Sequence, residues 1–239
     1  MVQTGLVTGL VGQFVLTAAL AGTVGLSERA WVIGISFGVT ATVLLAHAVG
    51  RHGDGGLRPA DRVTLTRAIL AGGVAALVAD SFGSPTPVPT LVGLTVVALV
   101  LDAVDGWIAR RTRTASVVGA RFDMEVDAFL ILVLSVYVAR SAGVWVLAIG
   151  TARYAFLAAG WLLPWMRRRL PPRFWRKVVA AVQGIVLTVA AAGVLPGPAI
   201  EIALVAALGL LAESFGRDVC WLARHRRILP RLVVVAAQR

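Results

Sequence analysis

Long apolar stretches, separated by short charged or glycine-rich segments, run along the whole chain. Their approximate limits are residues 5–25, 31–49, 63–80, 88–106, 123–140, 143–163, 177–195 and 199–218. Each stretch is close to the ~20 residues that an α-helix needs to cross a hydrocarbon layer roughly 30 Å thick. The pattern therefore predicts a transmembrane helix at each of these places.

The composition agrees with this pattern. Apolar residues make up 58% of the 239 residues and charged residues only 15%, and the mean hydropathy is +0.85. Soluble domains carry about 25% charged residues. We expect an all-α, polytopic helical membrane protein. No basic region precedes the first stretch and a second stretch follows closely, so we expect 5–25 to be a retained span and not a cleaved signal peptide.

Positive charges concentrate in every second connection between the apolar stretches, at 51–67, 110–121 and 167–177. They also concentrate after the last stretch, at 217–239. Short loops rich in Lys and Arg stay on the cytoplasmic side. We therefore expect both termini to be cytoplasmic in a plasma (inner) membrane. The net charge is +11, but it is spread over loops with no soluble domain to present it. Anionic membrane lipids are the expected partner, and nucleic acid is not.

Four aspartates lie where two apolar stretches meet one of these cytoplasmic loops: Asp102, Asp105, Asp123 and Asp127. Spacings of three and four residues place each pair on one face of its own helix. Carboxylates without partners are costly beside hydrocarbon, and a divalent cation offsets that cost. The spacing predicts that two facing helices hold one or two metal ions, Mg²⁺ or Mn²⁺.

Small and basic residues continue the same stripe. Gly106 and Ala109 would let a bulky ligand approach the backbone, and Arg110 would donate charge-assisted hydrogen bonds to a phosphate. A solvated acidic patch is the simpler interpretation of the aspartates alone, but such a patch requires no small residues at fixed offsets.

The complete pattern, D-x-x-D-G-x-x-A-R-x8-G-x-x-x-D-x-x-x-D from Asp102 through Gly119 to Asp127, resembles the signature of the CDP-alcohol phosphotransferase family. Its members are integral membrane enzymes with a core of six helices. They move a substituted phosphate from a CDP-linked donor to an alcohol and release CMP. The resemblance implies an added helical hairpin at 1–57, a catalytic core at 58–220 and a basic tail at 221–239.

A second match lies upstream, where Asp61-x-x-Thr64-x-x-Arg67 resembles the family's N-x-x-T-x-x-R at the start of the first core helix. Asp61 stands where the family has Asn, and an ionised Asp accepts hydrogen bonds without donating them. Thr64 is a candidate for the nucleotide pocket, although its hydroxyl can also bond back to its own helix.

The resemblance also implies roles for the signature residues. Asp102, Asp105 and Asp123 would be metal ligands, and Asp127 would contact the second metal and act as the general base. The residues expected to receive the CDP moiety are Gly106, Ala109, Arg110, Gly119 and Thr64. By analogy with its relatives the protein would be a homodimer.

Arg153 lies ten residues into an apolar stretch, where an arginine is costly unless it faces a polar cavity or a carboxylate. We expect it to face the active-site cavity and to hold the phosphate of a phosphorylated acceptor. The alternative is a structural ion pair with one of the signature aspartates.

The expected reaction is transfer of a phosphatidyl-type group from CDP-diacylglycerol to an alcohol such as inositol phosphate or glycerol phosphate. The acceptor stays open, because Ala128 follows the last aspartate where many relatives with phosphorylated acceptors have Lys or Arg. Two other functions are compatible with carboxylates in a membrane. An aspartate-rich prenyltransferase would release inorganic diphosphate, and a transporter would place its acidic residues at mid-span.

Overall fold

The computed structural model describes residues 2–51, 59–112, 117–168, 170–171 and 173–225. Within these ranges no side chain is described at 2–6, 46, 48–51, 59–60, 105–112 and 117–118. Most of the predicted basic tail, 221–239, lies outside the described residues.

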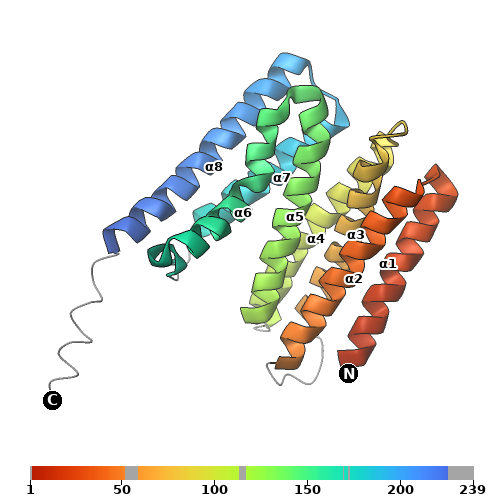
Figure 1. Ribbon diagram of the computed structural model, residues 1–239, viewed down its shortest axis with the longest axis horizontal. Helices are drawn as coiled ribbons and strands as arrows, with labels where there is room; N and C mark the ends of the chain where they lie inside the picture. The colour runs from red at the N-terminus through yellow and green to blue at the C-terminus, as the bar shows by residue number, and fades with distance from the viewer. Residues whose placement is uncertain (1, 52–58, 113–116, 169, 172, 226–239) are drawn as a thin grey trace.

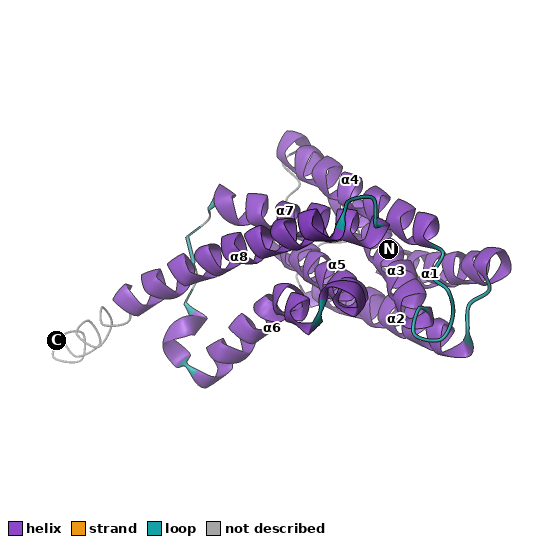
Figure 2. Cartoon of the chain, turned by 90° about the horizontal axis from the view of Figure 1, so that it is seen from above, coloured by secondary structure: helices purple, strands orange, loops and turns teal. Residues whose placement is uncertain are grey.

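The described residues form α-helices, two short 3-10 helices and connecting turns, with no strand (Figure 2). The α-helices are α1 (Val2–Val24), α2 (Glu28–Arg51), α3 (Pro59–Asp80), α4 (Val88–Thr112), α5 (Val117–Ala142), α6 (Leu147–Leu162), α7 (Phe174–Ala192) and α8 (Gly197–His225). The 3-10 helices η1 (Val144–Val146) and η2 (Pro164–Arg167) flank α6. Each predicted apolar stretch corresponds to one α-helix, so the all-α prediction is confirmed.

Among the described residues, 6 helices are long and apolar enough to cross a membrane: α1, α2, α3, α6 together with η1, α7 and α8. The apolar part of α4 is shorter, Val88–Val104. Helices α4 and α5 carry the signature aspartates, and these charges interrupt their apolar stretches. The chain is a polytopic helical membrane protein.

Helix α3 lies at the centre of one half of the molecule and packs against α1, α2, α4 and α5. In Figure 1 the hairpin α1–α2 lies at one side, and α6, α7 and α8 lie beyond α5. Within α3, 72% of the membrane-spanning part is buried, whereas the other five candidate spans are 17% to 33% buried. Protein therefore surrounds α3, and the other spans have exposed faces.

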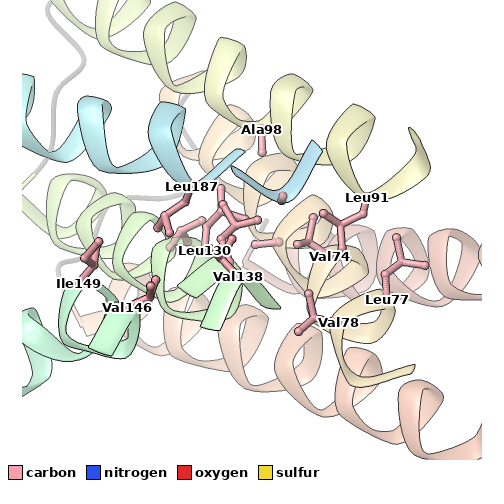
Figure 3. Packing of buried hydrophobic residues seen from close by; sticks show 14 of the residues in the cluster. Val74, Leu77, Val78, Leu91, Ala98, Leu130, Val138, Val146, Ile149 and Leu187 are labelled. Carbon is pink, nitrogen blue, oxygen red and sulfur yellow. The ribbon is translucent and has the colours of Figure 1, made fainter. Parts of the chain in front are cut away.

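The core that encloses α3 consists of aliphatic side chains from several helices. Figure 3 shows Val74 of α3 beside Leu91 of α4, with Leu130 and Val138 of α5 and Leu187 of α7 close by. All five residues are buried. This contact fixes α3, α4 and α5 relative to one another, and these are the helices that carry the candidate functional residues.

The hairpin α1–α2 joins α3 through a polar side chain seated between glycines. Gln13 of α1 is 1% exposed. A Cβ atom would lie 2.7 Å from Gln13 Cδ at Gly38 of α2 and 2.6 Å from Gln13 Oε1 at Gly72 of α3. Small residues permit such close helix contacts in membranes, where burial of apolar surface contributes little. The hairpin packs directly on α3, and its division from the core at residue 57 stays a prediction.

The contact between α5 and α6 depends on Gly150, where a Cβ atom would lie only 2.7 Å from the backbone Cα of Leu132. Because backbone cannot move aside as a flexible side chain does, Gly150→Ala is expected to destabilise the protein by about 1–3 kcal/mol. The measurement is the thermal unfolding midpoint in detergent. The control is Gly209→Ala on α8, where the new methyl group meets nothing within 4 Å. Equal midpoints for the two variants would contradict the predicted overpacking.

Candidate active site

Three of the four signature aspartates come together at one end of α4 and α5. Asp102 lies in the C-terminal half of α4, and Asp123 and Asp127 lie one turn apart near the start of α5. One carboxylate oxygen from each residue lies within 4.8 Å of the other two. All three side chains are partly exposed. The helical spacing therefore produces the predicted meeting of carboxylates from two helices.

A buried arginine from α3 occupies the middle of this group. Arg67 is 1% exposed, and its Nη1 atom lies 2.9 Å from Asp102 Oδ1. Its Nη1 and Nη2 atoms also form ion pairs with Asp123 and Asp127, respectively. Its Nε donates a hydrogen bond of 3.2 Å to the carbonyl oxygen of Ala98 on α4. One guanidinium thus connects α3, α4 and α5.

Arg67 belongs to a buried stripe along α3. Asp61 and Thr64 precede it at intervals of three residues, and both are buried. Residues at this spacing share one helix face, so the whole D-x-x-T-x-x-R motif lies on the inner side of α3. The predicted nucleotide-binding role of Thr64 stays a prediction.

Sequence reasoning did not assign a role in the site to Arg67. The signal was present, because Arg67 lies within an apolar stretch and an arginine there requires a partner. The apolar surroundings of Arg67 and of Arg153 in the sequence show that each needs a counter-charge, but not which of several carboxylates supplies it.

Several predicted residues lie where their side chains are not described. Asp105, Gly106, Ala109 and Arg110 belong to α4 beyond Asp102. Gly119 lies in the first turn of α5 and is partly exposed. Their assignment to the metal and to the CDP moiety stays a prediction.

Arg153 of α6 pairs with Glu125 of α5, with a further contact of 3.4 Å between its Nε and Glu125 Oε2. Glu125 follows Asp123 by two residues, which turns it about 200° around the helix. It therefore lies on the side of α5 away from Asp123 and Asp127. The structural partner of Arg153 is this glutamate and not a signature aspartate. Its role toward an acceptor phosphate stays a prediction.

The three aspartates suit a divalent metal. Their ligand atoms are carboxylate oxygens, the donors that Mg²⁺ and Mn²⁺ prefer. Three carboxylates and the guanidinium of Arg67 leave two negative charges among the described side chains of the site. A divalent cation supplies the matching charge.

A model of the CDP-alcohol phosphatidyltransferase family matches residues 57–212. The chain belongs to this family. The matched part begins just before α3, ends within α8 and includes Arg67 and all the signature aspartates. No curated protein and no solved structure matched the chain.

As a CDP-alcohol phosphatidyltransferase, the protein is a membrane transferase of phosphate-containing groups, with a CDP-alcohol as donor and an alcohol as acceptor. The family is metal-dependent, which agrees with the three converging carboxylates. Because the chain belongs to this family, its function is that of a CDP-alcohol phosphatidyltransferase and not that of a prenyltransferase or a transporter.

In this CDP-alcohol phosphatidyltransferase the ion pairs of Arg67 are more buried than the ion pair of Arg153, and the two arginines are expected to contribute differently to stability. In metal-free buffer, Arg67→Met leaves three carboxylates without their cation and is expected to cost about 3–5 kcal/mol. Arg153→Met removes a pair whose side chains are 29% and 49% exposed and is expected to cost less than about 1 kcal/mol. Equilibrium unfolding in detergent with a chelator measures both. A larger loss for Arg153→Met would show that the buried pairs of Arg67 are not the stronger contact.

Proposed function

We propose that the protein transfers a phosphatidyl group from CDP-diacylglycerol to a small alcohol and releases CMP. The observation that carries the proposal is the meeting of Asp102, Asp123 and Asp127 oxygens within 4.8 Å. This meeting occurs in a chain that belongs to the CDP-alcohol phosphatidyltransferase family. Neither observation alone specifies the donor lipid.

The residues that would hold metal are Asp102, Asp123 and Asp127, with Asp105 as a further ligand from α4. Bound Mg²⁺ or Mn²⁺ would neutralise charge on the diphosphate of the donor. The protein itself supplies the geometry, because α4 and α5 present their carboxylates toward each other from rigid helices packed against α3.

Asp127 is the proposed general base. The acceptor hydroxyl oxygen attacks the phosphorus that carries the diacylglycerol, and its proton passes to the Asp127 carboxylate. A bond from that phosphorus to the acceptor oxygen forms, and its bond to the CMP oxygen breaks. Asp127 suits this role because it lies one turn beyond Asp123 and is partly exposed, so a substrate can approach it.

The CDP moiety is proposed to lie along the end of α4, one turn beyond the metal ligands. Gly106 and Ala109 would allow close approach, and Arg110 would bind phosphate. Gly119 on α5 and Thr64 on α3 would complete this pocket.

The acceptor is proposed to be inositol phosphate or glycerol phosphate, with Arg153 as the ligand of its phosphate. The ion pair with Glu125, which turns away from Asp123 and Asp127 on α5, adds a condition. Arg153 would have to leave Glu125 and turn toward the aspartates, because an incoming phosphate competes with a carboxylate for the same guanidinium. Serine and unphosphorylated polyols carry no phosphate and do not need the guanidinium of Arg153. They are therefore the acceptors to compare.

The site is proposed to face the cytoplasm from a plasma (inner) membrane, and the protein is proposed to work as a homodimer. The supporting observation for the orientation is the charge asymmetry of the loops. Arg111, Arg113 and Arg121 lie in the sequence between Asp105 and Asp123, and such a concentration of arginines is typical of cytoplasmic segments.

The proposed reaction predicts release of CMP when the purified protein receives CDP-diacylglycerol, Mg²⁺ or Mn²⁺ and an acceptor. Chromatography of the nucleotide product measures it for inositol phosphate, glycerol phosphate, serine and inositol in parallel. A chelator is expected to abolish release. Metal-dependent binding of CDP without CMP release from any acceptor would exclude CDP-diacylglycerol or these alcohols as substrates.

Asp127→Asn is expected to lower turnover by at least about 10²-fold, because the amide cannot accept the proton, while CDP binding is largely retained. Glu201→Gln makes the same chemical change at an exposed position at the start of α8 and is expected to leave turnover unchanged. Unimpaired turnover in Asp127→Asn would remove the general-base assignment.

A further inference from the structure

We propose that Arg67 is a resident counter-ion of the carboxylate site, which holds the three aspartates together when no metal is bound and competes with the metal for them. The inference rests on the proposed metal site. It adds a residue outside the aspartate signature that sets how tightly that site binds a divalent ion.

The contacts of Arg67 are those of a cation at the centre of a ligand set. Its terminal nitrogens pair with Asp102, Asp123 and Asp127, each through the Oδ1 atom. These are the same three carboxylates whose oxygens lie close enough together to bind one ion. The guanidinium therefore takes the position of a ligand-bound cation between α4 and α5.

A metal ion and the guanidinium cannot keep all these contacts at once. A divalent ion needs carboxylate oxygens at about 2.0–2.6 Å, and the nitrogens of Arg67 now lie against those oxygens. The two cations also repel each other in a site that is shielded from water on the side of α3. Binding of metal must therefore displace at least part of the guanidinium from the aspartates.

Arg67 remains anchored during such an exchange. Its Nε is bonded to the Ala98 carbonyl oxygen at 3.2 Å, and its side chain is enclosed by protein. The displaced guanidinium stays beside the site and does not swing into solvent. This distinguishes it from the other ion-paired arginines of the described residues, Arg153, Arg173, Arg176 and Arg217, whose side chains are between 29% and 61% exposed.

The shared guanidinium also differs from an ordinary structural pair. Arg153, Arg173, Arg176 and Arg217 each pair with a single carboxylate in the part of the chain that the structure describes. Arg67 pairs with three carboxylates on two helices. One ion pair would be enough to hold α3 against its neighbours. Arg67 instead contacts all three candidate metal ligands, so it competes with a metal ion for them.

The test is Mn²⁺ binding to the purified full chain in detergent, followed by electron paramagnetic resonance of the free ion. Arg67→Met removes the competing cation and is expected to bind Mn²⁺ about tenfold more tightly than the unaltered protein. Arg140→Met is the matched control. Arg140 lies at the far end of α5 and donates to the Ser81 carbonyl oxygen at 2.5 Å, so its loss is expected to leave the Mn²⁺ affinity unchanged.

Arg67→Met also removes three ion pairs, so a second variant covers the case in which it does not fold without metal. Arg67→Lys keeps the charge but provides fewer directed hydrogen bonds. Its thermal unfolding midpoint without metal is expected to fall, and Mn²⁺ is expected to raise that midpoint at lower concentrations than in the unaltered protein. If Arg67→Lys needs the same Mn²⁺ concentration as the unaltered protein to raise its unfolding midpoint, the proposal is overturned.

The remaining outcomes separate the inference from the proposed function. If Arg67→Met binds Mn²⁺ with equal or lower affinity, Arg67 organises the aspartates without competing, and the inference is overturned while the metal site stands. If the unaltered protein binds no Mn²⁺, the metal site is wrong and the inference falls with it.

Discussion

The balance of charge around Arg67 is the constraint on which the rest of the structure depends. Three aspartates from two helices meet at one end of α4 and α5, and one guanidinium from a third helix contacts all of them. That contact requires α3 to pack against both α4 and α5. The rest of the surface of α3 then needs other partners. The hairpin α1–α2 supplies those partners, with Gln13 seated against Gly38 and Gly72. The apolar core beside the site serves the same end, because it fixes α3 against both aspartate-bearing helices.

Helix α5 separates two kinds of chemistry on its opposite faces. Asp123 and Asp127 face Arg67, and Glu125 turns the other way to pair with Arg153 of α6. Glu125, between the last two signature aspartates, therefore has a structural partner of its own. A change at Glu125 alters the attachment of α6 without removing a carboxylate from the group around Arg67.

Hydropathy and helical spacing predicted the positions of the helices and the meeting of Asp102 with Asp123 and Asp127. These features follow from local periodicity, which a single sequence contains. The partners of Arg67 and Arg153 were not predicted. They depend on which face of α3 and of α6 meets α5, and that choice is made by tertiary contacts such as the approach of Gly150 to Leu132. The seat of Gln13 was missed for the same reason, since its two glycines lie on different helices.

The enclosure of α3 has a consequence for how the chain is assembled in a membrane. A segment carrying Arg67 enters lipid poorly by itself, because an arginine near the centre of a spanning helix opposes insertion by about 2.5–3.5 kcal/mol. During synthesis α1 and α2 precede α3, and their Gly12 and Gly34 leave room for Ile69 and Ala76 of α3. The hairpin α1–α2 thus offers α3 a protein surface to join as it leaves the ribosome, before the aspartates of α4 and α5 exist to neutralise Arg67. Synthesis of α1 and α2 ahead of α3 would make them an insertion partner for the helix that carries Arg67.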